Sequence, residues 1–150
     1  MPIQQGQKAV IRTWDAQKGA QHKIHLAVDA HGMPVRIIIT AGSCSDIGQT
    51  FPLIQGIDVR FVLADKAYSA HRFREQLKEN GVQAVIPPIQ RGNRSLIEYD
   101  KYLYKMRHII ENTFLALKLW RAVATRYAKR SSSFLAAVQV RCIALWCKIL

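Results

Sequence analysis

The chain has 150 residues, of which 49% are hydrophobic, so it is long enough for one domain with a substantial core. It carries 22 Lys and Arg residues against 10 Asp and Glu residues, a formal net charge of +12. This charge makes nucleic acid the first partner to expect, with a basic membrane-surface protein as the competing interpretation. The N-terminus has no apolar signal core, and polar residues interrupt the longest apolar stretch, residues 134–150. We therefore expect no membrane span and a cytoplasmic location.

The cysteines are Cys44, Cys142 and Cys147, an odd number without Cys-x-x-Cys spacing. This pattern supports neither a disulfide framework nor a structural zinc site. We expect three buried thiols.

Residues 1–21 show no clear hydrophobic period, and we interpret them as a weakly structured leader. From residue 22 apolar residues alternate with others, residues 29–32 interrupt the pattern, and residues 35–40 resume it, which predicts a β-hairpin. His22 and His25 are three positions apart on the predicted strand and should face opposite sides, so they do not make a metal pair. Asp29 is best explained by the turn, where its side chain can bond nearby backbone.

Residues 41–46 end the second predicted strand and start a connecting helix that reaches residue 54, with Ser45 or Asp46 as its N-cap. The apolar run 59–64 then predicts a buried strand that stops at Asp65. Ligand chemistry gathers at the carboxyl ends of strands in α/β sheets, so Asp65 is a site candidate by position. The alternative is that Asp65 caps a helix over residues 69–80. A short strand over residues 82–86 and a polar loop with Arg91 and Arg94 follow, and the loop could contact phosphate.

Residues 99–118 predict an amphipathic helix with an unusual polar face. At 100° per residue, Tyr104, Arg107, Glu111 and Lys118 point in similar directions, and the opposite arc is apolar. The helix therefore presents an acid among bases. The alternative is that Glu111 is a solvated carboxylate tied to Arg107 by an i,i+4 contact.

The segment after this helix is basic and precedes a last, largely apolar helix that should close the core. Its basic residues suit a surface that holds a DNA strand, and they are Arg121, Arg126, Lys129 and Arg130.

Tyr104, Arg107, Glu111 and Lys118 are spaced as Tyr-x2-Arg-x3-Glu-x6-Lys. This spacing resembles the signature around the last acid of the Asp-Asp-Glu (DDE) triad in bacterial insertion-sequence transposases. The segments VLADKAY, AVIPP and RAVATRY follow the same family's order, and together they resemble the insertion sequence 5 family from about residue 22 to the end. Members commonly have Gly where Ala67 stands and Asp where Ser69 stands.

The resemblance implies an α/β, ribonuclease-H-like (retroviral-integrase-like) mixed sheet with flanking helices. It makes Asp65 the second acid and Glu111 the last, both holding Mg²⁺ or Mn²⁺, with Tyr104, Arg107 and Lys118 in support. The expected substrates are insertion-sequence ends and target DNA, and the expected activity is metal-dependent cleavage and strand transfer.

The family's first Asp has no counterpart in the sequence pattern, because Asp15, the one acid upstream of the predicted hairpin, lies too near it and lacks the family's flanking residues. We therefore expect residues 22–150 to form a partial catalytic domain without its first strand, from a truncated or split copy that is inactive alone. The chain could pair with itself or with a transposase segment from an upstream reading frame. The alternative is a catalytically inactive DNA-binding remnant that regulates transposition.

Overall fold

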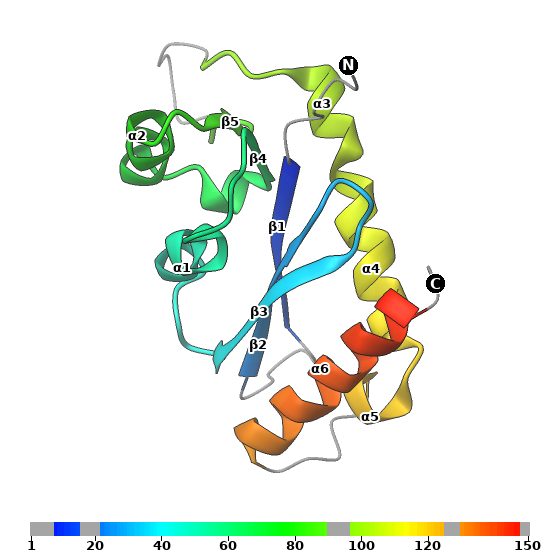
Figure 1. Ribbon diagram of the computed structural model, residues 1–150. Coiled ribbons are helices and arrows are strands. Elements are labelled where there is room, and N and C mark those ends of the chain that lie inside the picture. Colours follow the sequence, from blue (N-terminus) through cyan, green and yellow to red (C-terminus); the bar gives the residue numbers. More distant parts are fainter. Residues whose placement is uncertain (1–7, 16–21, 90–96, 125–129, 148–150) are drawn as a thin grey trace.

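The computed structural model describes residues 8–15, 22–89, 97–124 and 130–147 (Figure 1). Five strands form one sheet in the order β3-β2-β1-β4-β5. The strands are β1 (Lys8–Asp15), β2 (His22–Val28), β3 (Pro34–Ala41), β4 (Phe61–Ala64) and β5 (Gln83–Val85). Strands β1, β2 and β3 pair antiparallel, which confirms the predicted hairpin, whereas β4 pairs parallel with both β1 and β5.

A first strand is present and lies at the centre of the sheet, so the prediction that it is missing is wrong. β1 falls within the predicted leader, and its Ile11 is only 1% exposed. A central strand is covered on both faces and need not alternate apolar with polar residues, which is why the periodicity did not reveal it. The rest of the predicted leader, residues 1–7 and 16–21, lies outside the described residues.

Helices cover both faces of the sheet, and the sheet separates the core into two clusters (Figure 1). On one face, α1 (Thr50–Ile54) and α2 (His71–Glu79) pack against alternate residues of β1, β2 and β4. On the other face lie α4 (His108–Lys118), α5 (Arg121–Ala124) and α6 (Ser131–Cys147). Phe134 and Val138 of α6 are fully buried, so the last helix closes the core as predicted.

The predicted helix over residues 99–118 is helical from Lys101 onward. It consists of α3 (Lys101–Tyr104), a 3-10 turn at Lys105–Arg107 and α4, without a break in the chain. Asp100 caps its start by accepting hydrogen bonds from the backbone N–H groups of Tyr102 and Leu103, both at 2.9 Å. Its apolar side packs on the sheet, as the sequence pattern predicts.

A tight contact fixes α4 against the turn between β2 and β3. Gly32 has φ +82°, and a Cβ atom there would lie 2.8 Å from Cγ2 of Ile109. The Thr113 hydroxyl donates to the Gly32 carbonyl at 2.6 Å. Asp29 accepts hydrogen bonds from the N–H groups of His31 and Met33, at 2.8 and 2.9 Å, which confirms its predicted role in the turn.

Two smaller predictions need correction. Asp46 stands at the N-cap of a 3-10 turn, Ile47–Gln49, but its side chain does not cap it and instead pairs with Lys23 at 3.1 Å. Of the cysteines only Cys142 is buried, since Cys44 is half-buried and Cys147 is exposed. Cys147 is exposed because α6 packs only one of its sides on the core and leaves the other side open.

His25 is fully buried, and its Nε2 lies 2.8 Å from Oγ1 of Thr40, as suits a polar residue inside a strand. Within the described ranges, no helix combines the length and the apolar character needed to cross a membrane.

Candidate active site

Asp65 lies at the carboxyl end of β4, beside the central strand. It is extended, with φ −67° and ψ 161°, and the following turn, Lys66–Tyr68, is anchored by Tyr68, which is 1% exposed. The Asp65 side chain does not cap this turn, and α2 begins only at His71, after Ala70 at its N-cap position. The alternative that Asp65 serves as a helix cap is therefore wrong, and its carboxylate is directed elsewhere.

The carboxylate of Asp65 is held by two side chains from the α3–α4 segment. Arg107 Nη1 donates to Asp65 Oδ1 at 2.7 Å, and the Tyr104 hydroxyl donates to the same oxygen at 3.2 Å. The Arg107 guanidinium also lies over the Tyr104 ring, 5.5 Å from its centroid. The strand end and the helix are thus joined through one carboxylate oxygen.

Glu111 joins the same group of side chains. Its Oε1 lies 3.4 Å from Arg107 Nη1, so the i,i+4 contact considered as the alternative does exist. The same nitrogen, however, also binds Asp65. Two carboxylates from distant parts of the chain therefore meet at one nitrogen atom.

The surroundings shift two pKa values in this cluster. Burial lowers the pKa of Arg107, but the hydrogen bond to Asp65 and the charges of Asp65 and Glu111 outweigh it and raise the pKa overall. Burial is also the largest cause that raises the pKa of Tyr104, followed by the nearby negative charge of Asp65. Near neutral pH, Arg107 is therefore a cation and Tyr104 a neutral hydrogen-bond donor.

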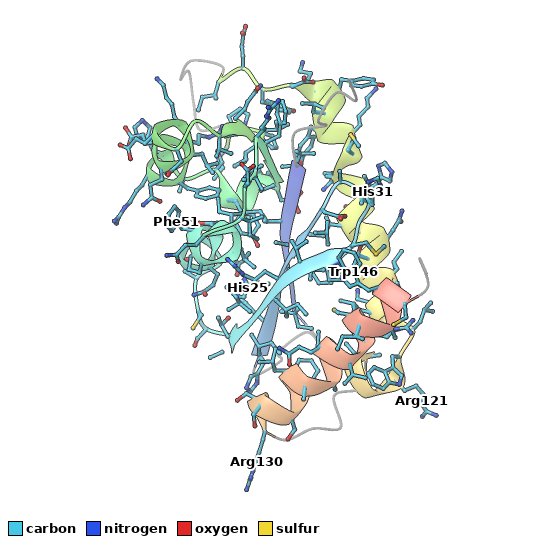
Figure 2. All side chains as sticks on the ribbon, viewed as in Figure 1. His25, His31, Phe51, Arg121, Arg130 and Trp146 are labelled. Atoms are coloured by element: carbon cyan, nitrogen blue, oxygen red, sulfur yellow. The ribbon has the colours of Figure 1, made fainter. Side chains whose placement is uncertain are left out.

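The remaining predicted site residues lie elsewhere or outside the described residues. Lys118 is exposed and follows Glu111 by two helical turns, about 10 Å along the axis, so its part in the site stays a prediction. Arg121 and Arg130 are exposed at the end of the molecule opposite α3 (Figure 2). The other predicted DNA contacts, which lie outside the described residues, are Arg91, Arg94, Arg126 and Lys129.

The donor set fits part of a divalent-metal site. Carboxylate oxygens are the ligands that Mg²⁺ and Mn²⁺ prefer, and one or two of them with water and phosphate can hold Mg²⁺. Among the described side chains, however, no three His, Cys, Asp or Glu residues gather as a metal site. Within the part of the chain whose side chains are described, Asp65 and Glu111 are thus two carboxylates that converge without a third.

The strand register identifies the position where a third carboxylate could stand. Ile11 of β1 pairs with Ala64 of β4, so the next residue of β1, Arg12, is level with Asp65. Arg12 also pairs with Leu26, which lies in the core under α4. Asp15 is three residues beyond Arg12, about 10 Å along the strand. The sequence pattern missed this position because it gave no sign of β1.

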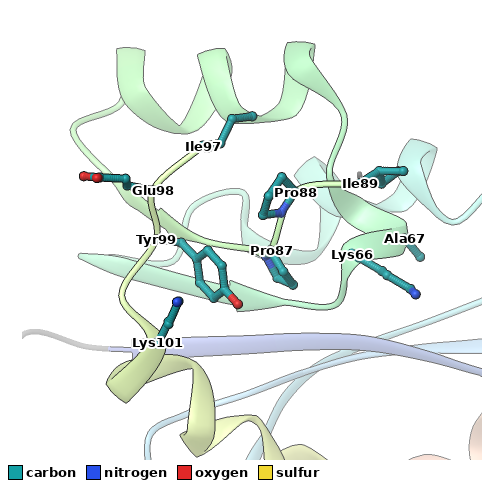
Figure 3. A pocket seen from close by; sticks show the side chains of 9 residues that line it. All are labelled: Lys66, Ala67, Pro87, Pro88, Ile89, Ile97, Glu98, Tyr99 and Lys101. Carbon is teal, nitrogen blue, oxygen red and sulfur yellow. The ribbon is translucent and has the colours of Figure 1, made fainter. Parts of the chain in front are cut away.

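A pocket of about 970 Å³ opens beside Lys66 and Ala67, the residues that follow Asp65 (Figure 3). Lys66 and Ala67 form one side, Pro87 and Pro88 follow β5, and Tyr99 and Lys101 lie at the start of α3. The Tyr99 ring meets the Tyr104 ring edge to face, with centroids 5.5 Å apart. The pocket wall is thus in contact with the tyrosine that holds Asp65.

Residues 1–147 match the family model described as the transposase DDE domain. The chain belongs to this family. It is 35% identical over 125 residues to a Brucella ovis protein named as a putative transposase for insertion sequence element IS6501, covering 83% of this chain and 96% of that protein. It is 28% identical to one named for IS402 from Burkholderia cepacia, covering 85% of this chain and 62% of that protein.

A solved structure has the same fold. The catalytic core domain of BIV integrase aligns with a TM-score of 0.60 over 92% of this chain and 82% of that one, at 17% identity. The predicted ribonuclease-H-like architecture is thereby confirmed, and the family match confirms the resemblance to DDE transposases. The narrower assignment to the insertion sequence 5 family stays a prediction.

Proposed function

We propose that this DDE transposase domain binds insertion-sequence ends and target DNA, and that Asp65 and Glu111 hold Mg²⁺ or Mn²⁺ for phosphodiester cleavage and strand transfer. The observation that carries the proposal is the convergence of these two carboxylates, from β4 and α4, on one guanidinium nitrogen. Divalent ions bound there would activate the attacking group and stabilise the leaving oxygen.

The neighbouring side chains have supporting roles in this proposal. Tyr104 orients the Asp65 carboxylate by donating a hydrogen bond to Oδ1. Arg107 holds both acids and can pair with phosphate, since a guanidinium forms two parallel hydrogen bonds with phosphate as readily as with carboxylate. Lys118 and the predicted basic residues would contact the DNA backbone, in keeping with the net charge of +12.

An inactive DNA-binding remnant is the second candidate, and one observation favours it. The position on β1 level with Asp65 is an arginine, and no third acid joins Asp65 and Glu111 among the described side chains. In this version the chain binds DNA in the bacterial cytoplasm but regulates a complete transposase. A second copy or an upstream-frame partner could supply the missing carboxylate.

A strand-nicking assay with Mg²⁺ or Mn²⁺ tests the part that Asp65 plays, and rapid nicking by the unaltered chain would exclude the inactive remnant. We expect the purified chain to bind DNA but to nick it very slowly, because loss of one ligand misplaces the metal ions. The variant Arg12→Asp places a carboxylate level with Asp65 and should increase nicking, and adding Asp65→Asn should abolish the gain. Asp58→Asn, which removes an exposed acid before β4, is the matched control.

Two results would revise this view. Rapid nicking by the unaltered chain, lost in Asp65→Ala, would show that another residue such as Asp15 or Asp29 supplies the third carboxylate. Nicking that persists in Asp65→Asn would remove Asp65 from the proposed site altogether.

A further inference from the structure

Arg107 lies between the two acids that are proposed to hold the metal. A single atom, Nη1, contacts Oδ1 of Asp65 at 2.7 Å and Oε1 of Glu111 at 3.4 Å. Both acids therefore already have a counter-ion, contributed by the helix that also carries Glu111.

Several contacts hold the guanidinium there. It lies over the ring of Tyr104, and the hydroxyl of that tyrosine binds the same oxygen of Asp65. The arginine is also placed one helical turn before Glu111, so little movement is needed to reach the acid. The side chain of Arg107 is nevertheless 40% exposed, compared with 25% for Asp65, which leaves it a route into solvent.

A divalent ion and the Arg107 guanidinium compete for the same lone pairs, those of Asp65 Oδ1 and Glu111 Oε1. Asp65 Oδ1 accepts from Arg107 and from Tyr104, so its acceptor capacity is largely used before any metal binds. Two cations on one oxygen would also repel each other. An ion that binds both Asp65 Oδ1 and Glu111 Oε1 must therefore displace Arg107.

We propose that Arg107 is a built-in competitor for the metal site: its guanidinium neutralises Asp65 and Glu111 until a divalent ion displaces it, and the released side chain then binds a DNA phosphate. This inference rests on the proposed function of the two acids. Metal binding and phosphate binding should then strengthen each other, since each favours the displaced position of Arg107.

The test compares Mn²⁺ affinity between variants of the whole chain, measured by electron paramagnetic resonance of the free ion. Arg107→Gln should bind Mn²⁺ about tenfold more tightly, because it removes a charge-assisted hydrogen bond that the ion must break. Arg72→Gln, which removes the same charge from an exposed position of α2, should leave the affinity unchanged. Equal or weaker binding by Arg107→Gln would overturn the proposal.

A measurement on the unaltered protein covers the case in which Arg107→Gln does not fold. During a Mg²⁺ titration, the side-chain Nε–Hε resonance of Arg107 should shift with the midpoint of metal binding. A resonance that stays constant up to saturation would contradict displacement.

The double variant Asp65→Asn/Arg107→Gln separates this inference from the function on which it rests. If the acids hold the metal, the tighter binding of Arg107→Gln should disappear in the double variant. If the double variant still binds Mn²⁺ tightly, the ion lies elsewhere and the proposed function fails, not merely the competitor.

Discussion

Gly32 is the residue that allows the β2–β3 turn to approach α4, the helix that carries Glu111. Its positive φ and the 2.8 Å approach of Ile109 are two separate obstacles to a side chain. Gly56 has a similar φ of +73°, but a Cβ atom there would meet no other atom within 4 Å, so this glycine isolates the effect of the backbone.

We expect Gly56→Ala to lower the free energy of unfolding by about 1 kcal/mol through backbone strain. Gly32→Ala should lower it by about 2 to 4 kcal/mol, because overpacking adds to the strain. Chemical denaturation monitored by circular dichroism measures both. Equal losses for the two variants would show that the turn does not press on α4.

The two cysteines of α6 should differ in reactivity. Burial raises the pKa of the Cys142 thiol to about 11, so near pH 8 it is almost entirely protonated, and the thiolate is the reactive form. Cys147 is exposed on the same helix. Timed alkylation followed by peptide mass spectrometry should label Cys147 well before Cys142, and labelling of Cys142 should speed up as the pH rises. Equal rates at pH 8 would contradict the packing of α6.

At the scale of elements, the sequence predicted the parts that have a local pattern. The hairpin of β2 and β3 shows alternation, the helix that carries Glu111 shows an apolar arc, and β4 is an apolar run that ends just before Asp65. The spacing of Tyr104, Arg107 and Glu111 put these three side chains on one helical face, and the structure brings all three to Asp65 or to its partner Arg107.

Other features depend on contacts that are distant in sequence. β1 is defined by its neighbours β2 and β4 on either side, so the sequence pattern missed the centre of the sheet. Likewise, Asp46 has the right residue type for a helix cap, but Lys23 lies within 3.1 Å and takes its carboxylate. Pairings of this kind cannot be read from residue spacing along one segment.

The pocket shown in Figure 3 yields a prediction about the start of α3. Its walls include Tyr99 and two prolines, and Lys66 and Lys101 outnumber the one acid, Glu98, a combination that suits a nucleotide with its base against the ring. Tyr102 lies three residues after Tyr99, in α3, but is 78% exposed and outside the pocket, which makes it a matched control.

Tyr99→Ala should weaken binding to a single-stranded oligonucleotide by about 1 to 2 kcal/mol, the usual contribution of one stacked base. Tyr102→Ala should leave the affinity nearly unchanged. Fluorescence anisotropy measures both, and thermal unfolding of Tyr99→Ala checks that the variant is folded. An equal loss in the two variants would exclude the pocket as a nucleotide site.

At the scale of the whole molecule, the net charge of +12 predicts salt-sensitive DNA binding. The logarithm of the binding constant should fall with the logarithm of salt concentration by about 0.9 for each phosphate neutralised. Replacing both Arg121 and Arg130 with Gln should reduce that slope by about 2 if each contacts a phosphate. A flat titration would contradict electrostatic binding, and an unchanged slope in the double variant would remove these two residues from the DNA surface.

We propose that Asp65 and Glu111 share one metal ion. The most direct measurement replaces Mg²⁺ with Fe²⁺ and generates hydroxyl radicals at the bound ion, which cut nearby backbone. We predict two cuts, one near residue 65 and one near residue 111, both lost together in Asp65→Asn and both retained in Asp58→Asn. A single cut, or cuts that survive Asp65→Asn, would contradict a shared site.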